Sequence, residues 1–208
     1  MTTAMKRHQV RQLLTTPGRI SSQARDLWMH VRASFASDPF ARAYRIVRPY
    51  TMSGAARLQG LYGAVQHVTF RGIPGDLVEC GTARGGSAAM LGLAMKESGV
   101  KRTLWVFDTF DGIPPPTAAD PDFEIAALYT GSFRGELAEV RELFAHLGIL
   151  ERAVLIPGRF QDTIPASDVG PIAVLHIDGD WYESVKVCLD FFYDRVSLGG
   201  VIQIDDSV

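Results

Sequence analysis

Five short apolar runs alternate with helical segments from residue 76 onward, and this alternation restricts the fold more than any other feature. The run at residues 172–177 is almost wholly apolar, as expected of a strand that helices cover on both faces. Strands that alternate with helices form a parallel, doubly wound sheet. We therefore predict an α/β fold with a mostly parallel sheet. The predicted strands are residues 76–80, 103–107, 153–156, 172–177 and 201–204.

Between these strands, apolar residues recur at helical spacing. Gly199 and Gly200 are expected to form the turn before the last strand. Residues 111–129 are proline-rich and predict a loop that serves as a lid or a wall for substrate, since long insertions at this edge of a sheet are commonly functional. The predicted helices are residues 24–35, 53–71, 88–98, 136–147 and 181–195.

Two of the strands end in clustered acids. Asp178 and Asp180 follow the strand that contains His176, and Asp205 and Asp206 follow the last strand. Ligands of such sheets bind outside the carboxyl ends of the strands, so these acids are expected to face one pocket. Crowded carboxylates repel each other unless a cation holds them, which points to a hard divalent metal. The alternative is that Asp205 and Asp206 cap a following helix or turn.

A glycine-rich turn, residues 81–87, separates the first strand from its helix. A turn of this kind aims free backbone N–H groups at a ligand. Asp108 ends the next strand, where an acid accepts hydrogen bonds from both hydroxyls of a ribose. A plain strand-to-helix turn is the alternative. A nicotinamide dinucleotide site is disfavoured, because the glycines do not follow the pattern G-x-G-x-x-G.

Charge is distributed unevenly along the chain. Residues 1–57 hold ten Lys and Arg but only two acids, whereas the net charge of the whole chain is -2. Without a dense basic run or a nucleic-acid motif, we expect no nucleic-acid partner. The apolar runs are too short to form an integral membrane segment. Cys80 and Cys188 fall in a predicted strand and helix, as reduced core residues of a cytoplasmic protein do. The first 25 residues also share the Arg-, Ser- and Thr-rich, acid-poor composition of transit peptides.

Several motifs, in order, resemble those of the macrocin O-methyltransferase (TylF) family. The resemblance runs from Thr51 to the end of the chain. It implies a Rossmann-like class I methyltransferase domain at residues 51–208. From their basic charge and short helical pattern, residues 1–50 are expected to form a helical N-terminal extension. The motifs are residues 51–52, 75–81, 84–87, 107–114, 176–184, 199–202 and 205–206.

The resemblance implies an S-adenosylmethionine- and Mg²⁺-dependent O-methyltransferase that acts on a hydroxyl of a sugar or glycosylated natural product. It implies that Asp178, Asp205 and Asp206 bind the metal. Asp178 or Asp180 would take the proton from the acceptor, with His176 as the other candidate base. Trp181 and Tyr182 either stack on a sugar ring or begin a packed helix. The implied cofactor residues are Glu79, Gly81, Thr82, Gly85, Ser87, Asp108, Phe160, Gln161 and Asp162.

This chain departs from the family pattern in two places. Ala83 stands where the family often has a bulky aromatic residue. The chain also ends at Val208, directly after the fifth predicted strand, where class I methyltransferases continue through a helix and a hairpin. We therefore expect a truncated domain that lacks the C-terminal hairpin. A catechol or phenol O-methyltransferase of the same fold and a non-catalytic S-adenosylmethionine-binding module are the alternative functions, and formation of a homo-oligomer is left open.

Overall fold

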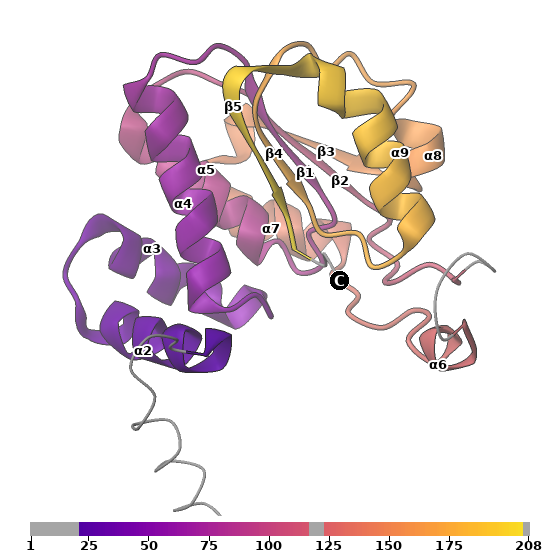
Figure 1. The fold of residues 1–208 in the computed structure, drawn as a ribbon, viewed down its shortest axis with the longest axis horizontal. Coiled ribbons are helices and arrows are strands. Elements are labelled where there is room, and N and C mark those ends of the chain that lie inside the picture. The colour runs from indigo at the N-terminus through magenta and orange to yellow at the C-terminus, as the bar shows by residue number, and fades with distance from the viewer. Residues whose placement is uncertain (1–20, 117–122, 206–208) are drawn as a thin grey trace, which may run out of the picture.

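The computed structural model describes residues 21–116 and 123–205, which form a five-stranded sheet with helices on both faces (Figure 1). Each pair of neighbouring strands is parallel, in the order β3-β2-β1-β4-β5. The first strand, β1, lies in the middle of the sheet. The chain then adds β2 and β3 on one side of β1 before it crosses to β4 on the other side. The carboxyl ends of β1 and β4 therefore flank the position where open α/β sheets bind ligands. The predicted fold class is confirmed.

The strands are β1 (Asp76–Cys80), β2 (Leu104–Asp108), β3 (Ala153–Pro157), β4 (Ile172–Ile177) and β5 (Val196–Ile204). The helices are α2 (Ser22–Phe35), α3 (Pro39–Val47), α4 (Ala55–Phe70), α5 (Gly86–Ser98), α6 (Phe123–Ala127), α7 (Leu137–Leu147), α8 (Phe160–Thr163) and α9 (Tyr182–Phe192). Short 3-10 turns occupy Arg48–Tyr50, Leu150–Arg152 and Tyr193–Arg195. None of the helices in the described part has both the length and the apolar character to cross a membrane.

Side chains of the central strands alternate between two apolar cores, one on each face of the sheet. Leu77 packs in the core with α4 and α5, whereas its neighbour Val78 packs in the core with α9. All six residues of β4 are buried, as its apolar sequence predicts. Cys80 and Cys188 are buried free thiols of the α9 core, so their predicted core positions are confirmed.

The prediction for the last strand is wrong at its start. β5 begins at Val196, and Gly199 and Gly200 lie inside it instead of forming a turn before it. Pairing with β4 changes register within this stretch, so the extra residues form a bulge. Gly199 has a φ of 85°, which glycine adopts without strain. A bulge and a turn both use a residue with positive φ, so the two glycines do not distinguish between them, which explains the error.

The first described helices pack on the body of the fold. Phe40 and Tyr44 of α3 are buried in the same core as Leu58 of α4. The carboxylate of Asp26 in α2 accepts a hydrogen bond of 2.9 Å from the backbone N–H of Ala56, in the first turn of α4. The predicted helix at 24–35 corresponds to α2, whereas α3 has no counterpart in the prediction. Residues 1–20 of the predicted N-terminal extension lie outside the described residues.

The expected loop after β2 contains a short helix, α6, that the sequence pattern does not predict. We use the term wall segment for residues 111–116 and 123–135. Backbone hydrogen bonds join its two ends, from Ile113 N–H to the Ser132 carbonyl (3.0 Å) and from Gly131 N–H to the Ile113 carbonyl (2.8 Å). The two ends of the segment thus form one connected unit above the sheet edge.

Candidate functional site

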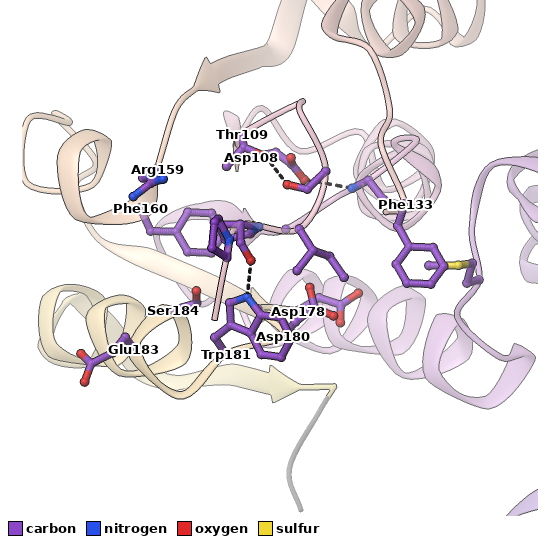
Figure 2. Close-up of a pocket in the computed structure, with 18 of the residues that line it drawn as sticks. Asp108, Thr109, Phe133, Arg159, Phe160, Asp178, Asp180, Trp181, Glu183 and Ser184 are labelled. Atoms are coloured by element: carbon purple, nitrogen blue, oxygen red, sulfur yellow. Dashed lines mark hydrogen bonds between the residues drawn. The ribbon is translucent and has the colours of Figure 1, made fainter. Parts of the chain in front are cut away.

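A cavity of about 320 Å³ lies at the carboxyl ends of the central strands. Residues that follow β1, β2, β3 and β4 line it, together with the segment before α4 and the wall segment. In Figure 2, Phe160 and Phe133 stand on opposite sides of the cavity, with Asp178 and Asp180 between them. The cavity therefore joins the glycine-rich turn, the end of β2 and the acids after β4 in one space. Its size falls within the range of small-molecule sites.

The glycine-rich turn and the acid-bearing loop after β4 touch through their backbones. Asp178 N–H donates to the Cys80 carbonyl at 2.8 Å. Gly81 has a φ of 91°, and a side chain there would meet the Asp178 carbonyl oxygen at 2.1 Å. Only glycine permits both this conformation and this approach. Gly81 thereby brings the predicted cofactor loop within contact of a predicted metal ligand.

Asp108 organises the glycine-rich turn. Its Oδ2 accepts hydrogen bonds from the N–H groups of Thr82 (2.7 Å) and Ala83 (3.0 Å), and its Oδ1 accepts one from Phe110 N–H (2.7 Å). The expectation of free N–H groups is therefore wrong for Thr82 and Ala83, because the acid of the next strand binds them. Each carboxylate oxygen accepts about two hydrogen bonds, so Oδ1 retains capacity for a ligand hydroxyl. Asp108 also lines the cavity.

The far end of the cavity is formed where β3 leads into α8. Arg159, Phe160 and Gln161 line it, and the ring of Phe160 faces the interior (Figure 2). Ser184, near the start of α9, closes the same end. An aromatic ring and an amide side chain at this position suit a flat heterocycle with hydrogen-bonding edges.

The predicted acids are brought together, with one outside the described residues. Asp178 and Asp180 line the cavity. Ligand atoms of His176, Asp178 and Asp205 lie within 4.8 Å of one another, close enough to bind one ion. Asp205 is buried, and Ser53 Oγ donates to its Oδ2 at 3.4 Å. The carboxylate oxygens of Asp178, which is half-buried, and Asp205, which is buried, fit a hard divalent cation. Asp206 lies outside the described residues.

His176 lies fully buried next to this group. Its Nδ1 donates to Glu79 Oε1 at 2.9 Å, and its Nε2 lies 3.5 Å from Asp205 Oδ1, without the geometry of a hydrogen bond. Burial alone lowers the pKa of His176, but the carboxylates of Asp205 and Glu79 outweigh that effect and raise the pKa to about 10. The imidazole is therefore positively charged at neutral pH.

The buried carboxyl of Asp205 remains ionised for the complementary reason. Burial favours its neutral form, but His176, Gln203 and Arg57 outweigh this effect and hold the pKa of Asp205 below its ordinary value. Gln203 donates to its Oδ1 at 2.9 Å, and the Arg57 guanidinium lies 3.8 Å from its Oδ2. Asp205 therefore presents a negative charge beside Asp178, which lines the cavity.

An apolar wall faces the acids. The indole N–H of Trp181 donates to the Pro114 carbonyl at 2.6 Å and so fastens the wall segment to the acid-bearing loop (Figure 2). Met52 and Phe133 also line the cavity, and both side chains are exposed. Phe133 has a positive φ of 58°, an uncommon conformation for a residue with a side chain.

Some lining residues have no counterpart among the predicted site residues. Met52 belongs to a motif that the family resemblance identifies. Phe133 lies four positions beyond the predicted loop, residues 111–129. Ser53 and Arg57 carry no local signal, because they approach Asp205 only through the fold. Of the predicted residues, Gly81, Asp108, Phe160, Gln161, Asp178 and Asp180 line the cavity. Those that do not line it are Glu79, Thr82, Gly85, Ser87, Asp162, His176 and Asp205.

The chain is similar to a family of known proteins. The family model for macrocin O-methyltransferase (TylF) matches residues 12–208. The chain is 37% identical, over 163 residues, to the 8-demethyl-8-(2,3-dimethoxy-alpha-L-rhamnosyl)-tetracenomycin-C 4'-O-methyltransferase of Streptomyces olivaceus, an overlap of 76% of this chain and 62% of that protein. It is 35% identical to the mycinamicin III 3''-O-methyltransferase of Micromonospora griseorubida, over 76% of this chain and 65% of that protein.

Solved structures lead to the same fold. The O-methyltransferase NovP superposes with a TM-score of 0.70 at 36% identity, over 76% of this chain and 67% of NovP. The calicheamicin methyltransferase CalS11 superposes with a TM-score of 0.60 over 91% of this chain and 80% of CalS11, but at 20% identity it supports the fold alone. The chain spans 62% and 65% of the lengths of the two relatives from Streptomyces olivaceus and Micromonospora griseorubida.

Proposed function

The chain belongs to the macrocin O-methyltransferase (TylF) family, and on this basis we propose that it forms the cofactor- and metal-binding body of an O-methyltransferase that methylates a sugar hydroxyl of a glycosylated natural product. The observation that carries the proposal is the single cavity lined by Gly81, Asp108 and Phe160 on one side and by Asp178 and Asp180 on the other. A nucleoside cofactor and a metal-bound acceptor require such neighbouring halves. The relatives named for acting on glycosylated compounds support the acceptor class.

The cofactor half would hold S-adenosylmethionine, which supplies a methyl group on a positively charged sulfur. Asp108 Oδ1 would accept from a ribose hydroxyl, and Phe160 and Gln161 would contact the adenine. The N–H groups of Thr82 and Ala83, already bonded to Asp108, keep the turn in shape for this contact. Exclusion of water by the wall segment would keep the methyl group for the acceptor.

The acid half would hold Mg²⁺ through Asp178, Asp205 and Asp206. When bound, this ion would lower the pKa of the acceptor hydroxyl and orient it. Asp180 or Asp178 would take the hydroxyl proton while the oxygen bonds to the methyl carbon and the carbon–sulfur bond breaks. We assign the base to these acids because they line the cavity, whereas His176 is fully buried and does not line it.

Calorimetry with S-adenosylhomocysteine tests the cofactor assignment directly. Asp108→Asn should weaken binding roughly tenfold or more, because it replaces a charged hydrogen-bond acceptor that also shapes the turn. Asp168→Asn is the matched control, since Asp168 is exposed and does not line the cavity, and it should bind like the wild type. A folded wild-type chain that does not bind S-adenosylhomocysteine would contradict the assignment.

Methyl transfer to a panel of acceptors tests the reaction. Mass spectrometry should detect methylation of a glycosylated macrolide or a rhamnosylated polyketide in preference to a catechol. Transfer should cease in EDTA and return with added Mg²⁺. Full activity in EDTA would argue against the metal, and methylation of the catechol alone would argue against the sugar acceptor.

A further inference from the structure

A connected set of buried polar side chains crosses three neighbouring strands beneath the cavity. Glu79 of β1 and His176 of β4 are register partners, and Asp205 directly follows β5. Glu79 and His176 are fully buried, and Asp205 is 6% exposed. The imidazole lies between the two carboxylates, with its Nδ1 2.9 Å from Glu79 and its Nε2 3.5 Å from Asp205. We call these three residues the buried relay.

The two ends of the buried relay belong to different halves of the site. Glu79 Oε2 accepts a hydrogen bond of 3.4 Å from Thr82 Oγ1 in the glycine-rich turn. The backbone N–H groups of Thr82 and Ala83 in the same turn donate to Asp108. At the other end, Asp205 is one of the acids close enough to bind one ion with Asp178. A change at the imidazole therefore reaches both the cofactor turn and the acid edge through direct contacts.

Both carboxylates depend on the imidazole in ways that no other contact replaces equally. Glu79 is fully buried and also accepts the 3.4 Å hydrogen bond from Thr82 Oγ1, but that hydroxyl is neutral, and a buried carboxylate without a positive partner is costly. Asp205 has further partners in Gln203, Ser53 and Arg57, but Arg57 is half-exposed and 3.8 Å away. Loss of the imidazole would leave two carboxylates facing each other across a buried space, where like charges repel.

We infer that His176 is a positioning residue that fixes Glu79 and Asp205 together and thereby makes the cofactor turn and the metal site depend on each other. This inference rests on the proposed function. His176 acts through the two carboxylates and contacts neither the cofactor nor the acceptor. Groups that orient metal ligands from behind commonly change metal affinity by about 10- to 100-fold when they are removed.

Calorimetry on the full chain, with Mg²⁺ alone and with S-adenosylhomocysteine alone, measures both ends of the buried relay. His176→Phe should weaken Mg²⁺ binding by about 10- to 100-fold and should also weaken S-adenosylhomocysteine binding measurably. His176→Gln retains an N–H donor and should restore part of both affinities. Val174→Ala is the control, because Val174 is fully buried in the same strand, and it should change neither affinity more than about twofold.

The electron spin-echo spectrum of bound Mn²⁺ tests the same inference on the wild-type chain, so a variant that does not fold leaves the test intact. A positioning role predicts a metal bound by oxygen alone, without nitrogen coupling. A directly coordinated His176 would show nitrogen coupling and overturn the inference. So would His176→Phe affinities no weaker than those of Val174→Ala. A wild-type chain that binds neither ligand would instead contradict the proposed function itself.

Discussion

At the scale of single residues, the close approach of Gly81 to Asp178 is the most demanding contact of the site. Gly81→Ala would place a methyl group 2.1 Å from the Asp178 carbonyl oxygen in a backbone conformation that alanine disfavours. We expect a loss of unfolding free energy of roughly 2 kcal/mol or more, measured by urea denaturation.

Gly63→Ala is the matched control for that substitution. Gly63 lies in α4, where a methyl group would meet nothing within 4 Å, so alanine should stabilise the chain by about 0.5–1 kcal/mol. Equal stability of Gly81→Ala and the wild type would show that the two loops do not approach as described.

The residue scale also shows which site features a sequence can predict. The place of Asp108 at a strand end is predictable, because it directly follows the apolar run of residues 103–107. Its three hydrogen bonds are not, because they depend on Ala83 and Phe110 adopting positive φ values of 46° and 57°. His176 was expected as a candidate base. Its actual neighbours, Glu79 and Asp205, come from two other strands.

At the scale of elements, the indole of Trp181 links α9 and the acid-bearing loop to the wall segment. Trp181→Phe keeps an aromatic ring but removes the hydrogen bond to the Pro114 carbonyl. A hydrogen bond of this kind contributes about 1 kcal/mol, so hydrogen exchange at the Ile113 amide should accelerate roughly fivefold. Binding of S-adenosylhomocysteine should change by less than about twofold.

Trp105→Phe provides the control for this element. Its indole N–H donates to Asp76 Oδ2 at 3.0 Å, at the opposite edge of the sheet from the cavity. Loss of that bond should lower overall stability by a similar amount and leave exchange at Ile113 relative to the rest of the chain unchanged. Unchanged exchange in Trp181→Phe would mean that other contacts hold the wall segment.

The bounds of strands and helices were predicted correctly where the residues that flank them have one clear meaning. β1 and β4 occupy the predicted residues because Gly75 and Pro171 precede them and Gly81 and Asp178 follow them. The start of β5 was wrong because Gly199 permits a bulge as readily as a turn. Helix α3 was missed although Asp38 caps it and Pro39 begins it, since the same pair of residues is also typical of a turn.

At the scale of the whole molecule, α2 stabilises the start of α4 through a direct contact between residues that are far apart in the sequence. The N-cap of α4 is Gly54, which has no side chain to bind the helix amides, and Asp26 of α2 supplies the missing carboxylate to Ala56 N–H. Asp26→Ala should therefore lower the unfolding free energy of the whole chain by about 1 kcal/mol, as loss of an N-cap does. Thermal or urea denaturation monitored by circular dichroism measures this effect.

Asp190→Ala is the control at this scale. Asp190 pairs with Lys186 one turn away on the exposed surface of α9, where water and salt screen the pair, so its loss should change the unfolding free energy little. An Asp26→Ala variant as stable as Asp190→Ala would indicate that α2 does not support α4. The chain sequence alone does not reveal this contact, because the two residues are 30 positions apart.

The contact between Gly81 and Asp178 also limits how this domain can be recombined with its relatives. A chimera that takes the glycine-rich turn from one parent and the acid-bearing loop from another combines two loops whose backbones must fit closely together at Gly81 and Asp178. The wall segment differs, since both of its ends leave the body between β2 and α7 and meet each other. Exchange of that segment as one unit, with both loops kept from a single parent, is therefore the crossover design that preserves the contact between the loops while it changes one wall of the cavity.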